Sequence, residues 1–568
     1  FLNTPGGFTA IHSLERSGKE VLVNGRLKVV ELTPADGFGA TTIATDDVVE
    51  HLNYGLLPEA AAVYDERGFA SGALMWHYEI QPGEEKHFDI AVPYTDRSQV
   101  LHLERALEET RSYWLRQLEK VQVEITAAPD LVRTIKSQLA YILINRDGDA
   151  IQPGSRCYRR TWIRDGSLTS AALLQNGFEK EVRAFIEWFA PYQYENGKIP
   201  CCVDKRGSDP VPEHDSHGEF IYLVMEYYRF TRDLDFLRAL FPRLLKAVAY
   251  IQELRSQCLT EDFQAGGNRA HLYGILPPSI SHEGYSAHPA YSNWDNLFAM
   301  KGLDDAAQAA AILGEKEEAE RLRSLAEEFR HCLLASIQAS MSLHGIDYIP
   351  GANDLGDFDA TSTTIGLDPA NTLQALPQAL EATFERYIEF FRARRDGKPF
   401  VDYTPYELRT VGTFLRLGQA DRAHEALDYF MQDRRPAGWN HWAEVVYKNP
   451  LTPRFIGDAP HGWVGSDFLR SVRNLFVYET AESLVVGAGI KTQWLEQGVK
   501  VVNLPTHFGP LTFSARRQTV DGKTLTTYEV DGPITAPVEL HVLVEGKTGA
   551  SKTLKVTLSQ LPGRVQIS

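Results

Sequence analysis

The chain has 568 residues, of which 43% are hydrophobic and 23% charged, so it can form two or three packed domains and lacks the composition of a disordered protein. Its formal net charge is −17, and its isoelectric point lies near 5.5. Phosphate backbones and anionic lipid surfaces are bound by clustered Lys and Arg. The charge therefore argues against a nucleic-acid partner, and we expect none.

The cysteines predict neither a zinc cluster nor a disulfide scaffold, because no CxxC pair is present and an odd number cannot all be bridged. Reduced thiols are expected at Cys157, Cys201, Cys202, Cys258 and Cys332. No apolar run approaches the roughly 20 residues of a membrane span. The chain begins without Met or a signal-peptide pattern. The first residues resemble the middle of a β-domain, so an export signal can precede them in a longer chain. Cytoplasmic and periplasmic locations are therefore both compatible with the sequence.

Residues 1–98 contain short alternating or β-rich runs, such as 21–23, 27–32 and 88–92, separated by Gly, Pro and Asp. This pattern predicts an N-terminal β-sandwich, incomplete at its start. A polar helical segment follows, and we interpret residues 99–128 as a helical linker.

From 129 to 488 the pattern changes to about twelve segments with apolar residues at i, i+3, i+4 and i+7, which indicates helices. Their connections alternate between short turns and long loops. The long loops run through about 147–164, 192–214, 256–291, 340–362, 395–405 and 434–465. In a closed ring of antiparallel helices all long loops lie at one end, and loops on a rigid scaffold usually carry function. The prediction is an (α/α)6 barrel, since the competing helical solenoid requires a sequence repeat that is not seen.

After residue 488 short β runs return, among them 499–504 and 538–544. They predict a small C-terminal β-sandwich over 489–568. The fold class is therefore expected to be multidomain and mainly α.

The first candidate acid for catalysis is Glu283, which lies in a long loop beside His282 and Tyr285, just before a helix opened by Trp294 and Asp295. A carboxyl group between aromatic residues is expected to be desolvated and to have a raised pKa, which suits a general acid. The alternative is an ordinary glutamate of a surface loop.

The second candidate is Glu444, in the last long loop. His441 and Trp442 precede it, so the acid lies in a cradle suited to a sugar. Asp458, His461, Trp463 and Asp467 follow before or at the start of the last helix. Asp467 can equally be an acid that favours a helix N-terminus.

A third cluster contains Trp162, Arg164 and Asp165, at the start of a helix. Arg can donate to, and Asp accept from, neighbouring sugar hydroxyls, although Asp165 can also be a helix cap. The segment 209–219 is rich in possible metal ligands, but it has no HExxH spacing or clear three-ligand set, and we expect no metal. Motifs of serine hydrolases, kinases and dinucleotide-binding proteins are absent from the sequence, and no cofactor is expected.

These motifs resemble those of the six-hairpin glycosidases, a group that includes the glucoamylase family (glycoside hydrolase family 15), disaccharide phosphorylases and α-L-rhamnosidases. The likeness covers roughly 130–487. Trp162–Gly166 is similar to the glucoamylase motif whose Arg-Asp pair holds the terminal sugar. The segment His282–Tyr285 looks like the loop that presents the general acid, and Glu444 falls where these families carry the general base.

The resemblance implies an inverting exo-acting glycoside hydrolase, with an α-glucoside as substrate, Glu283 as general acid and Glu444 as general base. Inversion requires the two carboxyl groups to be about 6.5–9.5 Å apart, whereas retention requires about 5–5.5 Å. The residues expected to bind the oligosaccharide or glycoside substrate are Trp162, Arg164, Asp165, His282, Tyr285, Trp294, Asp295, His441, Trp442, His461 and Trp463.

Two features depart from these families. Gly284 follows Glu283, where glucoamylases usually have a second acid. No clear phosphate-binding loop is found, which favours hydrolysis over phosphorolysis. A disaccharide phosphorylase, an α-L-rhamnosidase and a non-catalytic carbohydrate-binding protein stay as alternatives, and the oligomeric state is left open.

Overall fold

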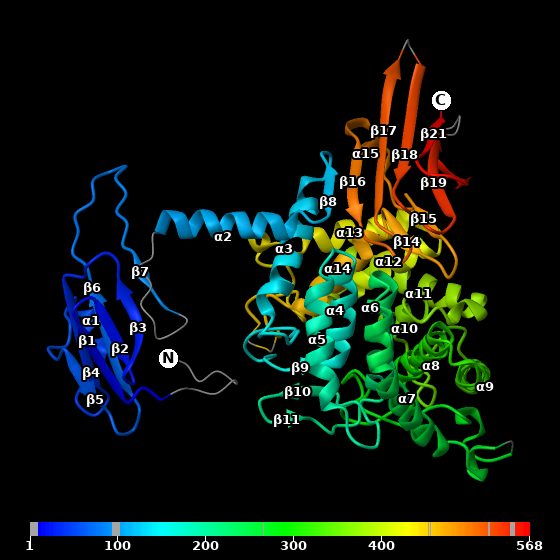
Figure 1. Cartoon of the computed structure of the whole chain (residues 1–568), viewed down its shortest axis with the longest axis horizontal. Coiled ribbons are helices and arrows are strands. Elements are labelled where there is room, and N and C mark those ends of the chain that lie inside the picture. The colour runs from blue at the N-terminus through cyan, green and yellow to red at the C-terminus, as the bar shows by residue number, and fades with distance from the viewer. Residues whose placement is uncertain are drawn as a thin grey trace. The chain divides into compact units, whose positions relative to one another are not determined.

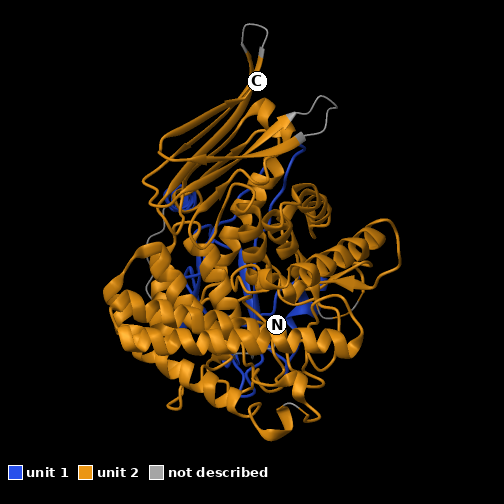
Figure 2. Ribbon diagram, turned by 90° about the vertical axis from the view of Figure 1, so that its right-hand side faces the viewer, with its two compact units in different colours: residues 1–115 blue, residues 116–568 orange. Residues whose placement is uncertain are grey.

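The structure of the protein is a computed structural model. It describes residues 10–93, 103–264, 266–452, 454, 456–520, 523–545 and 551–567. The chain forms two compact units, residues 1–115 and 116–568 (Figure 2).

The first unit consists of two small sheets. The larger has the strand order β5-β1-β2-β3-β7, and β4 pairs with β6. The strands are β1 (Ser13–Ser17), β2 (Glu20–Val23), β3 (Arg26–Glu31), β4 (Gly37–Thr42), β5 (Ala62–Tyr64), β6 (Ala70–Met75) and β7 (Ile90–Ala91), with the short helix α1 (Val48–Asn53) after β4. A small apolar core surrounds Leu14, Val21, Ala40 and Ala70. The helix α2 (Leu103–Leu118) follows, and the predicted limit between residues 98 and 99 lies outside the described residues.

The second unit is dominated by helices (Figure 1). Their contacts form a double ring. The inner helices are α4 (Ile163–Leu174), α6 (Ser216–Thr231), α8 (Asn293–Leu313), α10 (Ala360–Thr363), α12 (Arg409–Arg416) and α14 (Gly462–Arg473). Each inner helix packs against the next, a 3-10 turn over Thr364–Gly366 extends α10 to α12, and α14 packs against α4 to close the ring. The outer helices are α3 (Pro129–Asn145), α5 (Glu179–Phe189), α7 (Leu234–Ser256), α9 (Lys316–His344), α11 (Pro377–Arg395) and α13 (Ala420–Gln432). The predicted (α/α)6 barrel is confirmed.

The helix pattern explains which helices lie inside. Every residue of α4 and α14 is buried, whereas α9 buries only a stripe that includes Leu322, Phe329 and Leu333. A helix buried on all sides belongs to a core, and a helix with one apolar stripe covers it. Tight turns link inner to outer helices, and Gly314, with a φ of +84°, ends α8 in the left-handed conformation that glycine adopts most easily. The long loops therefore all lead into the N-termini of inner helices.

Two further sheets form the C-terminal part of this unit. Their strand orders are β14-β15-β19-β20 and β21-β18-β17-β16-β8. The strands are β8 (Gln122–Ile125), β14 (Val477–Glu479), β15 (Leu484–Val486), β16 (Val499–Leu504), β17 (Leu511–Val520), β18 (Lys523–Asp531), β19 (Val538–Glu545), β20 (Ser551–Leu558) and β21 (Gly563–Ile567), with the helix α15 (Thr492–Gln497) before β16. The structure places β8 of the expected linker, and β14 and β15 of the expected barrel segment, in these sheets. Strands of three or four residues carry too little pattern to be assigned without their distant partners.

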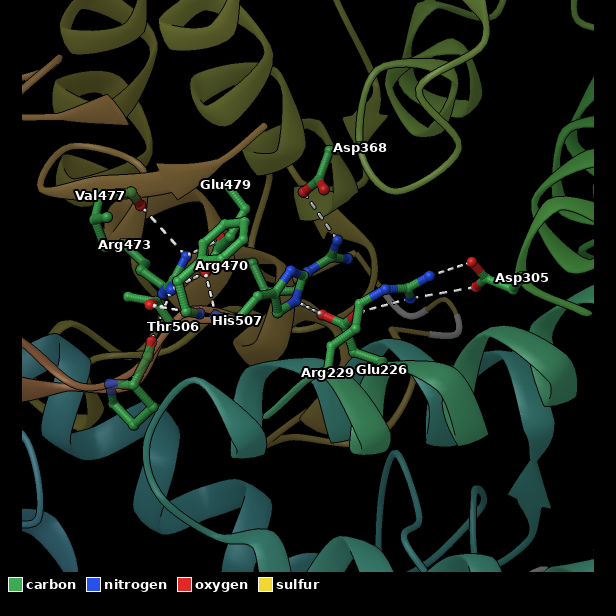
Figure 3. Close-up of polar contacts among 12 residues, drawn as sticks. Glu226, Arg229, Asp305, Asp368, Arg470, Arg473, Val477, Glu479, Thr506 and His507 are labelled. Carbon is green, nitrogen blue, oxygen red and sulfur yellow. Dashed lines mark hydrogen bonds and ion pairs between the residues drawn. The ribbon is translucent and has the colours of Figure 1, made fainter. Parts of the chain in front are cut away.

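An ion-pair network connects the C-terminal ends of the inner helices to the C-terminal sheets (Figure 3). Arg473 of α14 bonds both carboxylate oxygens of Glu479, at 2.7 and 2.8 Å, and His507 lies 3.0 Å from Glu226 of α6. Burial alone raises the pKa of Glu479, but the charges of Arg473 and His507 and the hydrogen bond from Arg473 together outweigh it and lower the pKa to about 2. Arginines near helix C-termini also offset the partial negative charge there.

A cavity of about 980 Å3 lies at this same end of the barrel, and Glu226, Asp368, Glu479 and Arg470 are among its lining residues. Each of these carboxylates has a cationic partner: Asp368, for example, is 3.0 Å from Arg470. Carboxylates held ionised in this way are poor proton donors, so Glu226, Asp368 and Glu479 are poor candidates for a general acid. Among the described residues, every helix falls short of the length and apolarity needed to cross a membrane.

Candidate active site

The candidate catalytic residues lie at the opposite end of the barrel, where the N-termini of the inner helices meet the long loops. Arg164 and Asp165 are in the first turn of α4, Glu213 and Asp215 directly precede α6, and Trp463 is in the first turn of α14. Helix N-termini carry partial positive charge, so several of them around one site favour bound carboxylates.

Glu283 lies in the turn before α8, with a φ of +67°. Residues other than glycine rarely adopt this left-handed conformation, and such residues are concentrated at functional sites. The indole N–H of Trp162 donates a hydrogen bond of 3.1 Å to Oε1 of Glu283. The Glu283 side chain is 52% exposed. The expectation that flanking aromatic residues enclose this carboxyl group is therefore wrong.

The two residues expected to enclose Glu283 instead anchor its loop. The Nε2 atom of His282 is 2.8 Å from the Ser362 hydroxyl, and the His282 ring packs edge-on against Trp294. Tyr285 donates a hydrogen bond of 2.9 Å to Asp357. These contacts direct both rings away from Glu283 and leave its carboxylate open to solvent.

Glu444 is held by two tyrosines. The hydroxyl of Tyr158 donates to Oε2 of Glu444, and the hydroxyl of Tyr406 donates to Oε1 over 2.9 Å. Gly457 closes over this carboxylate with a φ of +73°, and a Cβ atom there would lie 2.8 Å from Glu444 Oε2. The carboxylate is thus fixed in one orientation.

Arg164 is the buried centre of a group of carboxylates. Its Nη1 atom is 2.6 Å from Glu213 and 3.8 Å from Asp215, its Nε atom is 3.7 Å from Asp165, and its Nη2 atom is 3.9 Å from Glu283. Burial raises the pKa of Asp165 to about 7 and that of Glu213 to about 8. One guanidinium cannot offset four carboxylates, so some of these groups hold a proton at neutral pH.

The two predicted catalytic carboxylates belong to this one cluster. The charges of Glu444 and Glu283 both add to the effect of burial in raising the pKa of Asp165, so both act on the same buried group. Their hydrogen-bond partners also touch, since the rings of Tyr158 and Trp162 meet edge-to-face with centroids 5.6 Å apart.

The floor of the site is aromatic. The ring of Trp463 lies 4.3 Å from that of Tyr406, and the guanidinium of Arg164 is 5.2 Å above the indole. Within the described part of the chain, the indole N–H of Trp463 and the Oδ2 atom of Asp165 are buried without a hydrogen-bond partner. A buried donor and a buried acceptor without partners are costly, and water or ligand hydroxyls would satisfy both.

Two residues expected to bind sugar do not reach the site. Trp442 is 0% exposed, and its indole N–H donates to the backbone carbonyl of Phe430 over 2.9 Å. His441 is likewise 0% exposed and packs between Tyr141 and Trp439. The prediction of substrate contact is wrong for both, because Trp442 packs against Phe468 of α14, and His441 packs against Tyr141 of α3 and Trp439 of its own loop.

Three further predicted residues support the site from behind. Trp294 donates a hydrogen bond of 2.8 Å to Asp215, and Asp295 accepts hydrogen bonds from two buried serines. Burial raises the pKa of Asp295 to about 8. His461 caps α14, and its ring packs against Tyr158.

Sequence reasoning missed several members of the site. Tyr158 and Asp215 lie within segments that drew attention, but nothing in the sequence connects Tyr406 with Glu444, 38 residues later. Asp458 accepts hydrogen bonds from the backbone N–H groups of Arg156, Cys157 and Tyr158, at 2.7, 3.1 and 3.1 Å. Asp458 therefore fixes the loop that carries Tyr158.

No protein-family model matches the sequence, and no curated protein matches it either. Solved structures do share its fold. An α-L-rhamnosidase from Dictyoglumus thermophilum is 12% identical with a TM-score of 0.55, and the match covers 98% of this chain and 63% of that one. An α-L-rhamnosidase from Aspergillus terreus is 11% identical with a TM-score of 0.51, covering 98% and 64%.

A GH78 family rhamnosidase of Bacillus sp. GL1 is 14% identical with a TM-score of 0.53, and the match covers 74% of this chain and 42% of that one. This chain thus spans less than two thirds of the length of each of these three enzymes. It shares with its α-L-rhamnosidase neighbours the fold of an (α/α)6 barrel with accompanying β-domains.

Proposed function

We propose that the chain is an inverting, exo-acting glycoside hydrolase in which Glu283 is the general acid and Glu444 the general base. The observation that carries this proposal is a pair of carboxylates whose donors touch: Trp162 donates to Glu283, Tyr158 donates to Glu444, and the two rings lie 5.6 Å apart. Glycoside hydrolysis needs one carboxyl group to protonate the leaving oxygen and a second to activate water.

Glu444 suits the role of base. Each of its oxygens accepts one tyrosine hydroxyl, and a carboxylate oxygen can accept a further bond from water. Burial and the charge of Glu444 raise the pKa of Tyr158 and of Tyr406 well above the usual value, so both tyrosines remain donors. In its ionised form Glu444 can take a proton from water.

Glu283 is assigned the role of acid because its side chain is 52% exposed at the end of the barrel that carries the long loops, so a leaving group can reach it. Its contact with Trp162 and the charge of Arg164, 3.9 Å away, orient the carboxyl group. In the proposed arrangement Arg164 and Asp165 hold the terminal sugar over Trp463, and the activated water attacks from the Glu444 side.

Two substrate classes follow from different observations. The motif Trp162–Gly166 supports an α-glucoside, whereas the neighbours with the same fold, named as α-L-rhamnosidases, make an α-L-rhamnoside the second candidate. A disaccharide phosphorylase would use the same acid but would depend on inorganic phosphate.

The deciding experiment incubates the protein with aryl α-glucosides, aryl α-L-rhamnosides and α- and β-linked disaccharides, with and without phosphate, while NMR follows the anomer first released. We expect an inverted sugar without phosphate. A retained anomer would refute inversion, and phosphate dependence would indicate a phosphorylase. Binding of sugar without release would indicate a non-catalytic protein.

Replacing Tyr158 with Phe removes one donor to Glu444. A hydrogen bond to a charged group contributes about 1.5–3 kcal/mol, so kcat/KM is expected to fall by about 10- to 150-fold. Tyr273→Phe, in an exposed part of another long loop, is the matched control. An unchanged kcat/KM in Tyr158→Phe would contradict the role of this tyrosine.

A further inference from the structure

A small three-stranded sheet lies beside the candidate active site. It has the order β11-β10-β9 and comprises β9 (Thr161–Trp162), β10 (Cys202–Asp204) and β11 (Gly207–Ser208). Cys202 pairs directly with Trp162 across β9 and β10, and Cys201 and Cys202 are buried against the same indole in one apolar cluster. Two adjacent thiols thus lie behind the residue that donates to Glu283.

A carboxylate completes this group. Asp209 follows β11, and its backbone N–H donates to the Cys202 carbonyl over 2.9 Å, which brings its side chain back to the thiols. The two sulfur atoms and one Asp209 oxygen all lie within 4.8 Å of one another, and the Sγ of Cys202 is 3.9 Å from Asp209 Oδ2. Tetrahedral coordination, with metal–sulfur bonds of about 2.3 Å and a metal–oxygen bond of about 2.1 Å, needs ligand atoms about 3.6–3.8 Å apart. Small side-chain rotations would reach this spacing.

The donor set selects the kind of ion. Two thiols and one carboxylate suit zinc and similar thiophilic divalent ions, whereas Mg2+ and Ca2+ prefer oxygen ligands alone. The Asp209 side chain is 24% exposed, which provides a path from solvent and room for a water as fourth ligand.

We propose that Cys201, Cys202 and Asp209 bind a thiophilic divalent cation of the Zn2+ class next to the active site. Binding replaces two thiol protons with one doubly charged ion, so the net charge of the group is unchanged. The remaining negative charge lies next to Arg160, whose Nη2 atom is 2.6 Å from Asp209 and whose Nε atom is 3.0 Å from Asp204. No electron transfer is involved.

The position of the site gives the ion a route to the catalytic group. The Arg160 guanidinium lies 5.2 Å from the Trp162 ring, and it also bonds Asp204 at 3.0 Å, so it can turn toward Asp204 when an ion takes Asp209. The bound ion beside the Trp162 indole and the movement of Arg160 would both act on Trp162, the donor to Glu283. We therefore expect the ion to inhibit the enzyme. This expected inhibition rests on the proposed function, whereas the proposed binding of the ion does not.

The test is a titration of the reduced full-length protein with Co2+, followed by competition with Zn2+ in the presence of a chromophoric chelator. We expect one equivalent of Co2+ to give a thiolate-to-metal charge-transfer band that Zn2+ abolishes. Cys202→Ser and Cys201→Ser should weaken binding by more than about 100-fold, because even the partners of metal ligands contribute about 10- to 100-fold to affinity.

Asp209→Asn, at a partly exposed position, gives a third test in case the cysteine variants fold poorly, and it should also weaken binding. Cys258→Ser and Cys332→Ser alter buried thiols elsewhere and should leave the charge-transfer band unchanged. Absence of the band in the wild-type protein, or equal affinity in Cys202→Ser and Cys258→Ser, would overturn the proposal. Because the band is read without substrate, a protein with no glycosidase activity would still give a clear answer on the ion.

Discussion

Glu444→Gln and Glu283→Gln are each expected to lower kcat by about 10²- to 10⁴-fold, the usual contribution of a general acid or base. Gln keeps the size of each side chain, so at position 444 one tyrosine can still donate to the amide oxygen and the other can accept from the amide NH2 group, but the proton transfer is lost. Steady-state rates on the substrate identified by the NMR screen provide the measurement.

The leaving group separates the two roles. An aryl glycoside with a strongly acidic phenol needs little protonation, so Glu283→Gln should recover most of its rate on such a substrate, whereas Glu444→Gln should stay slow. Glu195→Gln, on an exposed part of the loop before α6, is the matched control and should retain full activity. If Glu283→Gln is equally slow on both kinds of substrate, Glu283 is not the acid.

Arg164→Met is expected to lower the free energy of unfolding by about 3–5 kcal/mol near neutral and alkaline pH, the usual cost of leaving buried charges without their partner. Arg164 is the cation closest to Glu213, and it also lies beside Asp165 and Asp215. Without it, several buried carboxylates either remain ionised and unpaired or take up protons.

The loss should depend on pH. The pKa of Asp165 is raised to about 7 and that of Glu213 to about 8. A raised native pKa gives a contribution to stability that is present at low pH and is lost as pH rises through the native value. In Arg164→Met these groups lose their cation, so the penalty should be small at about pH 5.5, where they can be protonated, and full at about pH 8.5.

Urea unfolding at both pH values measures this difference. Arg238→Met is the control, because Arg238 is 57% exposed and pairs with Asp235, which is 96% exposed, at the surface. Its effect should stay within about 0.5 kcal/mol at both pH values. An equal loss of stability at the two pH values in Arg164→Met would show that the carboxylates around Arg164 do not determine the effect.

The barrel could be predicted from the sequence because its signals are local. The 3.6-residue spacing of apolar side chains belongs to each helix separately, and the alternation of short and long connections places all long loops at one end. The place of Arg164 and Asp165 in the site could also be predicted, because both residues lie at the start of α4, directly after a long loop. Short strands such as β8 were missed, because a four-residue segment becomes a strand only through pairing with β16, far along the chain.

The site needed the tertiary structure wherever a role depends on contacts between distant segments. Trp442 is of a residue type that often binds sugars, but the surrounding helices bury it. Glu283 was expected to be enclosed, but it is exposed because His282 and Tyr285 form their hydrogen bonds elsewhere. Tyr406 and Glu444 meet only when the barrel closes. Thus the sequence by itself determined the helices and the order of their loops, since these follow from local periodicity. Only the tertiary structure decided which polar side chains face one another, because burial and pairing depend on the whole ring.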